Sequence, residues 1–444
     1  MYQLLIVDDE PYICQGLSRL LEGSGLPIGK IVTAHSGYEA LDHIRMEDID
    51  LIVTDIQMGS MNGIELMHQA RMIKPWVQAI VISAHETFQY AQMAMRLGAK
   101  DYLIKPLNGR QFLDTVRDVL LKTERPAVDH EEVIAGFEDR FRMEEPLPAR
   151  DAMLQRLLAA SPEEAPHVAA SLLAQHGIRL EGPYFAVLML KLDADSEPKL
   201  RAFSAADVAL VRYAALNIAS ELLGREWRHV SFYSSDRELG IILQWDERQY
   251  ADPGVNKLNL LDMLGRSLHH AILKYLGIAA VIGISQILTA VSFLPTLGEQ
   301  ARRSLRLSRE YRDHYVFYYG DFAWSASMHE EPTQEELAAQ TNLIVERAMA
   351  YIMENYAQKG LTLHEVAQRN HVSPNYLSYL YKKQTGYNLW EHVIKLRMEE
   401  SMRLLQQTDL RRYEIADRVG YESPEHFSKI FKKYFGASPS EFKK

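Results

Sequence analysis

Cysteine is nearly absent from this 444-residue sequence, which has only Cys14. A single cysteine excludes an intramolecular disulfide framework and a cysteine-based metal site. Because Cys14 lies in a predicted helix, we expect it to be a buried structural thiol. No apolar run approaches the roughly 18 residues needed to cross a membrane. The N-terminus has no basic leader before its first predicted strand. We therefore expect a cytoplasmic protein with no membrane partner.

Basic residues are in the minority, and the formal net charge is −10. This charge argues against a protein that binds nucleic acid over its whole surface. The C-terminal part reverses the balance, with 16 Lys and Arg residues against 12 Asp and Glu residues from Thr341 onward. An acidic body that ends in a basic module permits local DNA binding. The hydrophobic content of 47% is ordinary for a globular protein, and the length suggests about three domains.

Short apolar runs alternate with helical patterns over residues 1–122, and four of these runs end at polar side chains. The residues at these ends are Asp8–Asp9, Asp55, Ser83 and Lys105. Continuous apolar runs between helices are typical of parallel strands that are buried on both faces. Ligands of such sheets bind beyond the carboxyl ends of the strands. The sequence therefore predicts one edge with three carboxylates, a hydroxyl and an ammonium group.

The chemistry of this edge follows from its charges. Asp8, Asp9 and Asp55 would repel one another unless a cation lies among them. Their oxygen atoms suit Mg²⁺, which usually takes one or two carboxylates and keeps several waters. One carboxylate is then free to act as a nucleophile in phosphoryl transfer. The metal and Lys105 would neutralise the phosphoryl oxygens, and Ser83 could donate a hydrogen bond to them. The alternative is that acidic residues simply end the strands here.

The order Asp8–Asp9, Asp55, Ser83 and Lys105-Pro106 resembles the receiver domain of two-component response regulators. The resemblance covers residues 1–122 and implies a flavodoxin-like (CheY-like) doubly wound α/β fold. It also implies that a sensor histidine kinase phosphorylates Asp55, and that the peptide bond before Pro106 is cis. The remaining implied roles are Mg²⁺ ligands for Asp8, Asp9, Asp55 and the Gln57 carbonyl, a phosphoryl-binding role for Lys105, and a switch pair of Ser83 and Tyr102.

Two residues depart from the receiver pattern without removing any chemistry. Ser83 stands where Thr is commoner, and Gly59 stands where the loop often has Pro. By the same resemblance, phosphorylation would change the face around residues 86–97 and 100–101 and the helix that carries Arg117. We expect this face to form a homodimer, with an Asp101–Arg117 pair as a candidate contact. Two solvated charges are the alternative for that pair.

Residues 183–322 have a second α/β pattern, between a helical linker at 123–182 and another linker at 323–340. The predicted order of strands and helices, with a hairpin turn at 234–238, resembles a degenerate nucleotide-cyclase (GGDEF-like) domain. The turn reads Ser-Ser-Asp-Arg-Glu and lacks glycines that would let the backbone approach a triphosphate. Asp193 and Asp195 after the first strand are expected to be solvated. We therefore expect no enzyme activity, with cyclic-dinucleotide synthesis as the alternative.

An internal repeat occupies residues 365–386 and 414–436. Each copy has a short helical pattern, then a Ser-Pro pair that opens a second helix, then a glycine that ends it. In a duplicated helix-turn-helix, each second helix can enter a major groove while lysines meet phosphates. A helical protein-interaction bundle is the alternative. The residues expected at the N-caps and C-terminal ends are Ser373, Ser423, Gly386 and Gly436.

The repeat resembles the AraC/XylS-type DNA-binding domain over residues 341–444. The resemblance implies an all-α tandem helix-turn-helix, with recognition helices at 374–384 and 424–434 joined by a long helix at 389–406. Double-stranded DNA is the implied partner, and RNA polymerase is an expected one. The candidate DNA contacts are Asn375, Tyr376, Ser378, Tyr379, Lys382 and Lys383 in the first recognition helix, and Glu425, His426, Lys429, Lys432 and Lys433 in the second.

The two resemblances together predict a response regulator. Phosphorylation of Asp55 would control sequence-specific DNA binding and transcription. An alternative keeps DNA binding but makes a small ligand of the middle domain the signal.

Overall fold

The computed structural model describes most of the chain in two compact units. The described residues are 1–59, 61–83, 99–122, 130–143, 148–192, 205–224, 227–235, 237–251, 256–311, 314–322 and 334–442. Unit 1 consists of Met1–Arg125, Ala350–Thr362 and Leu389–Lys444, and unit 2 of Pro126–Met349 and Leu363–Asn388. Among the described residues, no helix has the length and apolar character needed to cross a membrane.

The first part of unit 1 is a five-stranded parallel sheet in the order β2-β1-β3-β4-β5. This order and the alternation with helices are those of the predicted doubly wound α/β fold. The strands are β1 (Tyr2–Val7), β2 (Ile28–Ala34), β3 (Leu51–Asp55), β4 (Gln78–Ser83) and β5 (Asp101–Ile104), and the helices described between and after them are α1 (Pro11–Glu22), α2 (Gly37–Met46), α3 (Gly63–Ile73) and α5 (Gly109–Lys122).

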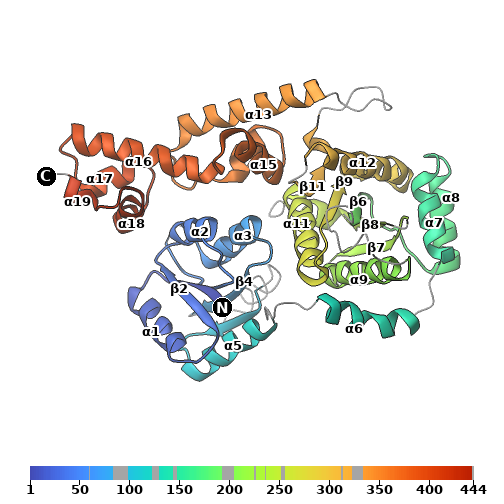
Figure 1. The fold of residues 1–444 in the computed structure, drawn as a ribbon, viewed down its shortest axis with the longest axis horizontal. Helices are drawn as coiled ribbons and strands as arrows, with labels where there is room; N and C mark the ends of the chain where they lie inside the picture. Colours follow the sequence, from blue (N-terminus) through green and yellow to red (C-terminus); the bar gives the residue numbers. More distant parts are fainter. Residues whose placement is uncertain are drawn as a thin grey trace. The chain divides into compact units, whose positions relative to one another are not determined.

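Helices cover both faces of this sheet, which explains why its strands read as continuous apolar runs. Side chains alternate between the two faces along each strand. Leu4 and Ile6 of β1 therefore join one core with α1 and α5, whereas Leu5 and Val7 join another with α2 and α3. Figure 1 shows α1 and α5 on one side of this sheet and α2 and α3 on the other. All five residues of β3 are buried. The parallel sheet buried on both faces is thus confirmed.

The single cysteine is buried, as predicted. Cys14 is 1% exposed and packs in the core between α1 and the sheet. Burial, with a smaller contribution from the charge of Asp8, raises the pKa of the thiol to about 11. The thiol is therefore protonated at neutral pH and is a poor nucleophile.

Unit 2 contains a mixed six-stranded sheet, which follows the helices that the structure describes in the region 123–182. The main strand order is β11-β9-β6-β8-β7, and the short β10 pairs with β6. The predicted hairpin is present as β7 and β8, which pair antiparallel. The helices before the sheet are α6 (His130–Met143), α7 (Pro148–Ala159) and α8 (Ala165–His176), the strands are β6 (Tyr184–Leu192), β7 (Arg228–Tyr233), β8 (Glu238–Trp245), β9 (Ala280–Ile284), β10 (Leu288–Thr289) and β11 (Val316–Tyr318), and the other helices are α9 (Ala205–Leu223), α10 (Glu247–Ala251), α11 (Lys257–Leu276) and α12 (Leu294–Arg306).

The middle α/β region has its own apolar core. Alternate residues of β6 and β8 pack with α9 and α11 on one face of the sheet. The element order agrees with the predicted strand, helix, hairpin, helix, strand, helix and strand. Asp193, Asp195 and Asp236 lie outside the described residues. The resemblance to a cyclase domain therefore remains a prediction, while the middle α/β architecture is confirmed.

The C-terminal region is helical, and its two predicted recognition helices begin at the predicted prolines and end one residue after the predicted ends, directly before the predicted glycines. The hydroxyl oxygens of Ser373 and Ser423 accept hydrogen bonds from the backbone N–H groups of Tyr376 and His426. Gly386 and Gly436 follow these helices with φ of 79° and 80°, a left-handed conformation that favours glycine. The helices are α13 (Gln334–Asn355), α14 (Leu363–Arg369), α15 (Pro374–Thr385), α16 (Leu389–Gln407), α17 (Arg412–Arg418), α18 (Pro424–Phe435) and α19 (Pro439–Phe442).

The compact units divide the predicted 341–444 module. The first helix-turn-helix, α14 and α15, belongs to unit 2 with the middle region. The second, α17 and α18, belongs to unit 1 with the parallel sheet. The predicted domain boundaries remain predictions, because compactness alone does not define an independently folding domain.

Candidate functional site

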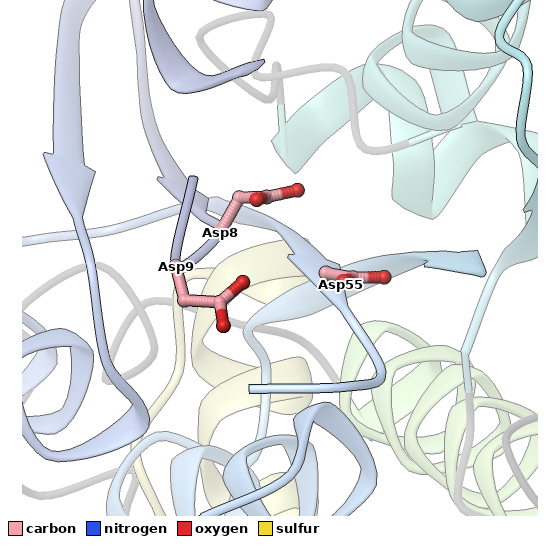
Figure 2. A group of neighbouring side chains, drawn as sticks. All are labelled: Asp8, Asp9 and Asp55. Atoms are coloured by element: carbon pink, nitrogen blue, oxygen red, sulfur yellow. The ribbon is translucent and has the colours of Figure 1, made fainter. Parts of the chain in front are cut away.

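Three carboxylates meet at the carboxyl edge of the parallel sheet. Asp8 and Asp9 directly follow β1, and Asp55 is the last residue of β3. Because β1 and β3 are paired neighbours, their ends bring these residues together. Ligand atoms of the three side chains all lie within 4.8 Å of one another, and Figure 2 shows the side chains next to one another. Asp8 and Asp55 are buried, whereas Asp9 is exposed.

Lys105 follows β5 and contacts two of the three acids. Its Nζ lies 3.0 Å from Asp8 Oδ2 and 3.3 Å from Asp55 Oδ2. Asp55 Oδ1 accepts a hydrogen bond of 2.9 Å from the N–H of Ile56. The other oxygen of Asp8, Oδ1, accepts one of 2.9 Å from the N–H of Glu10. The carboxylates are therefore held in place, and the ammonium group lies between two of them.

Burial and charge act in opposite directions on these groups. Burial raises the pKa of Asp55, and the nearby charge of Asp8 adds to that rise, while Lys105 opposes it. Burial alone would lower the pKa of Lys105, but Asp8 and Asp55 raise it overall through hydrogen bonds and charge. One ammonium group thus faces three acids, and the remaining negative charge favours a cation at this edge.

The predicted switch residues lie on the two neighbouring strands. Ser83 ends β4 and is buried, and Tyr102 in β5 is partly buried and pairs in register with Val81. The N–H of Lys105 donates a hydrogen bond of 2.7 Å to the carbonyl of Ser83. The Lys105–Pro106 peptide bond is cis, as expected. Gln57 lies in the loop after β3 with an exposed side chain.

The predicted dimer face is described only in part. Residues 84–98 lie outside the described residues. Arg117 forms an ion pair of 2.8 Å with Asp114 on its own helix. Asp101 accepts hydrogen bonds from the N–H of Tyr102 and the hydroxyl of Thr115. An Asp101–Arg117 contact between two copies of the chain remains a prediction.

Gly63 supports the site and was not expected from the sequence. It is the first residue of α3, and its N–H donates a hydrogen bond of 2.9 Å to the carbonyl of Ile56. A Cβ atom at Gly63 would lie 2.0 Å from the backbone oxygen of Asp55 and 3.0 Å from Thr54 Oγ1. Only glycine therefore lets α3 begin this close to the phosphoacceptor candidate. A lone glycine carries no sequence signal for such an approach.

We predict that Gly63→Ala lowers the free energy of unfolding by about 1–3 kcal/mol, because either β3 or α3 must shift. The same shift moves Asp55, so binding of Mg²⁺ at the acidic edge should weaken as well. Chemical denaturation and Mg²⁺ titration measure the two effects. Gly16→Ala in α1 is the control, since a Cβ there meets nothing within 4 Å. Equal stability of Gly63→Ala and the control would contradict the packing argument.

The candidate DNA contacts differ in exposure. Lys382, Lys383, Lys432 and Lys433 are exposed near the ends of the two recognition helices. By contrast, Tyr376 and His426 are 1% and 5% exposed. One predicted base contact in each recognition helix is therefore buried, and the role of these two residues in DNA binding remains a prediction. Of the other candidates, Glu425 and Lys429 are exposed, and Asn375, Ser378 and Tyr379 are partly buried.

Two family models match the two regions that carry these features. A response regulator receiver domain matches residues 4–117, and a helix-turn-helix domain matches residues 366–444. The acidic edge with Lys105 lies in the first region, and both serine-capped helices lie in the second. The chain therefore has the domain composition of a response regulator, with a receiver domain in its N-terminal part and an AraC-type helix-turn-helix domain in its C-terminal part. This is the architecture of a DNA-binding regulator of transcription.

Similar proteins include an uncharacterized transcriptional regulatory protein, YesN, of Bacillus subtilis (strain 168). It is 24% identical over 450 residues, which cover 100% of this chain and 98% of the relative. The C-terminal domain of AraT, a response regulator from Geobacillus stearothermophilus, is 43% identical, with 22% of this chain and 83% of that chain covered and a TM-score of 0.22. A response regulator receiver domain protein from Clostridium thermocellum is 27% identical. The match covers 28% of this chain and 97% of that chain, with a TM-score of 0.26.

Proposed function

We propose that Asp55 accepts a phosphoryl group from a sensor histidine kinase, and that phosphorylation controls sequence-specific DNA binding by the tandem helix-turn-helix. The observation that carries this proposal is the constellation at the sheet edge. A buried carboxylate, Asp55, lies beside a lysine ammonium at 3.3 Å and two further acids. Such an edge can hold a cation and a phosphoryl group next to a nucleophilic oxygen.

The acids fit a Mg²⁺ ion, which would supply positive charge to the phosphoryl oxygens. Asp8, Asp9 and Asp55 would hold it, together with the backbone carbonyl of Gln57. The donor set consists of hard oxygen atoms, and three acids face one lysine, so a divalent cation balances the edge. The exposed Asp9 leaves a path by which a hydrated ion can enter.

The chemical step is an in-line transfer. A carboxylate oxygen of Asp55 attacks the phosphorus of a phosphohistidine, an O–P bond forms, and the P–N bond breaks. The electron pair of the broken bond goes to the imidazole of the kinase, which leaves as a neutral ring because its other nitrogen already carries a proton. Lys105 would stabilise the negative charge on the transferred group, because its ammonium already contacts Asp55. Ser83, buried at the end of β4, would then donate a hydrogen bond to the phosphoryl group.

The receiver would signal through Ser83 and Tyr102, and the phosphorylated chain would act as a homodimer. The tandem recognition helices would bind double-stranded DNA and bring the regulator to RNA polymerase in the cytoplasm. No further enzymatic activity is proposed for the middle region. Selection of DNA sites from a random pool, with and without beryllofluoride and Mg²⁺, tests this function when the mass in solution is followed. Site affinity that does not change with beryllofluoride would contradict it.

Lys432 offers a test of the DNA-binding role. This exposed side chain at the end of α18 should contact a phosphate and not a base. We expect Lys432→Ala to weaken binding equally for all duplexes and to lower the slope of log affinity against log salt by about 1. Fluorescence anisotropy at several salt concentrations measures both. Lys395→Ala is the control, because it removes a partly exposed lysine of α16 that faces Glu399 at 4.0 Å. A change of sequence preference in Lys432→Ala would refute the phosphate contact.

A further inference from the structure

Within unit 1, helix α2 of the receiver contacts the second recognition helix α18. Lys429 Nζ forms an ion pair of 2.9 Å with Glu39 Oε1. His426 Nε2 lies 3.5 Å from Asp42 Oδ2. Both acids are buried, with 2% of Glu39 and 5% of Asp42 exposed. Two candidate DNA contacts of α18 thus face two carboxylates of the same chain.

Further contacts extend this interface on both sides. The guanidinium of Arg45 lies 3.7 Å from the ring centroid of Trp390 in α16, a cation–π contact. Met46 at the end of α2 packs against the apolar core of α16, α17 and α18. Burial alone would raise the pKa of Glu39, but the N–H of His35 and the nearby His426 and Lys429 lower it overall. Glu39 is therefore ionised at neutral pH and pairs with Lys429 as a charged group.

Within unit 2, the middle region contacts the first recognition helix in a corresponding way. Asp321 is 2% exposed, and its two oxygens accept hydrogen bonds from the N–H and the hydroxyl of Ser373, at 2.5 and 2.6 Å. Ser373 is the N-cap of α15. The rings of Phe322 and Tyr376 have centroids 4.7 Å apart, as do those of His314 and Tyr379.

The positions that make these intramolecular contacts are equivalent in the two repeats. Tyr376 and His426 are the third residues after the N-cap serines, and Tyr379 and Lys429 are the sixth. In helix-turn-helix proteins the N-terminal part of the recognition helix faces the base edges. Since a side chain cannot contact a base and a domain of its own chain at once, DNA must compete with these intramolecular contacts.

We propose that the chain's own domains contact DNA-facing positions of both recognition helices and so compete with DNA, and that Glu39 and Asp42 of the receiver hold the second helix by imitating the negative charge of DNA. This proposal rests on the proposed function and adds how the receiver reaches the DNA-binding region. The cover over α18 is polar and charged, whereas the cover over α15 combines a buried carboxylate with aromatic rings.

Three contacts connect the phosphorylation site to this interface. His35 Nδ1 lies 3.2 Å from the carbonyl oxygen of Asp8, and the N–H of His35 donates a hydrogen bond of 2.8 Å to Glu39 Oε2. The other oxygen of Glu39 contacts Lys429. A shift of Asp8 upon phosphorylation of Asp55 can therefore alter the position of Glu39. This route supplies a physical link between the two sites, and coupling along it is what the experiment measures.

The test uses the full-length chain without phosphoryl donor and a 30-base-pair duplex, about three helical turns, selected from a random pool with the wild type. We expect Glu39→Gln with Asp42→Asn to bind this duplex about tenfold more tightly than the wild type. The amide and carboxylate have the same shape, so the hydrogen bonds of His35 and Arg45 can persist. The control pair, Glu22→Gln with Asp118→Asn, removes the same charge from exposed positions on α1 and α5 and should bind like the wild type. Equal affinities of the test pair and the wild type overturn the proposal.

A second measurement needs no variant. Hydrogen exchange of the wild type with saturating duplex should show faster exchange in Gly37–Met46, because DNA displaces α2 from α18, and unchanged exchange in Pro11–Glu22. Unchanged exchange in Gly37–Met46 overturns the proposal even if the test pair is unstable. The outcomes distinguish this proposal from the proposed function. Tighter binding by the test pair with no response of the wild type to beryllofluoride supports competition by the intramolecular contacts and contradicts control by phosphorylation. Unchanged binding by the test pair with a response of the wild type to beryllofluoride supports control by phosphorylation and overturns the competition.

Discussion

Asp55→Asn should abolish phosphorylation of the receiver by acetyl phosphate and Mg²⁺. The amide cannot act as the nucleophile, yet its oxygen can still accept the 2.9 Å hydrogen bond that Ile56 donates to Oδ1. The fold should therefore persist while the reaction is lost. Intact-mass spectrometry before and after treatment with hydroxylamine measures the effect, since hydroxylamine cleaves an acyl phosphate.

Asp48→Asn is the matched control for this change. Asp48 carries an exposed carboxylate, 86% accessible, that pairs with Lys74 on the same domain. The control should be phosphorylated like the wild type. A hydroxylamine-sensitive phosphoryl group on Asp55→Asn would mean that another acid, such as Asp8 or Asp9, is the acceptor.

Lys105→Ala should slow phosphorylation by about 10²-fold, the usual loss when one donor to a developing anion is removed. The ammonium contacts both Asp8 and Asp55, so its removal takes away positive charge where phosphoryl oxygens would gather. The pH dependence should change as well. Lys105 lowers the pKa of Asp55 against the effect of burial. Without Lys105 this pKa rises, and phosphorylation should be lost at a higher pH as the solution is acidified.

Initial rates of acetyl phosphate labelling over a pH series measure both effects of Lys105→Ala. Lys100→Ala is the control, because it removes an exposed lysine from the same domain. The wild-type rate in Lys105→Ala, or an equal loss in the control, would contradict the role given to Lys105. A slower rate with an unchanged pH profile would show that Lys105 acts on the phosphoryl group but does not set the ionisation of Asp55.

Much of this molecule could be predicted from local sequence patterns. The ends of apolar runs located Asp8, Asp55 and Lys105 at one sheet edge, because parallel strands bring their carboxyl ends together. Serine caps and C-terminal glycines defined both recognition helices, because these residues satisfy helix ends through short-range hydrogen bonds. Such features depend on neighbours a few residues away and therefore leave a pattern.

The contacts between distant segments left no such pattern. Glu39 and Lys429 are 390 positions apart, and Asp321 and Ser373 are 52 apart. Glu39 reads as an ordinary helical acid, and Asp321 reads as the end of an α/β region. Gly63 likewise gives no sign that Asp55 lies against its Cα. Tertiary packing decides these three features, and periodicity or capping rules cannot express it.

Control of DNA binding through Asp55 can be measured as the affinity of the full-length chain for its selected duplex, with and without beryllofluoride and Mg²⁺, in the wild type and in Asp55→Asn. Beryllofluoride should tighten binding by the wild type and leave Asp55→Asn unchanged. Equal tightening in both proteins, or no change in the wild type, would contradict control of DNA binding through Asp55.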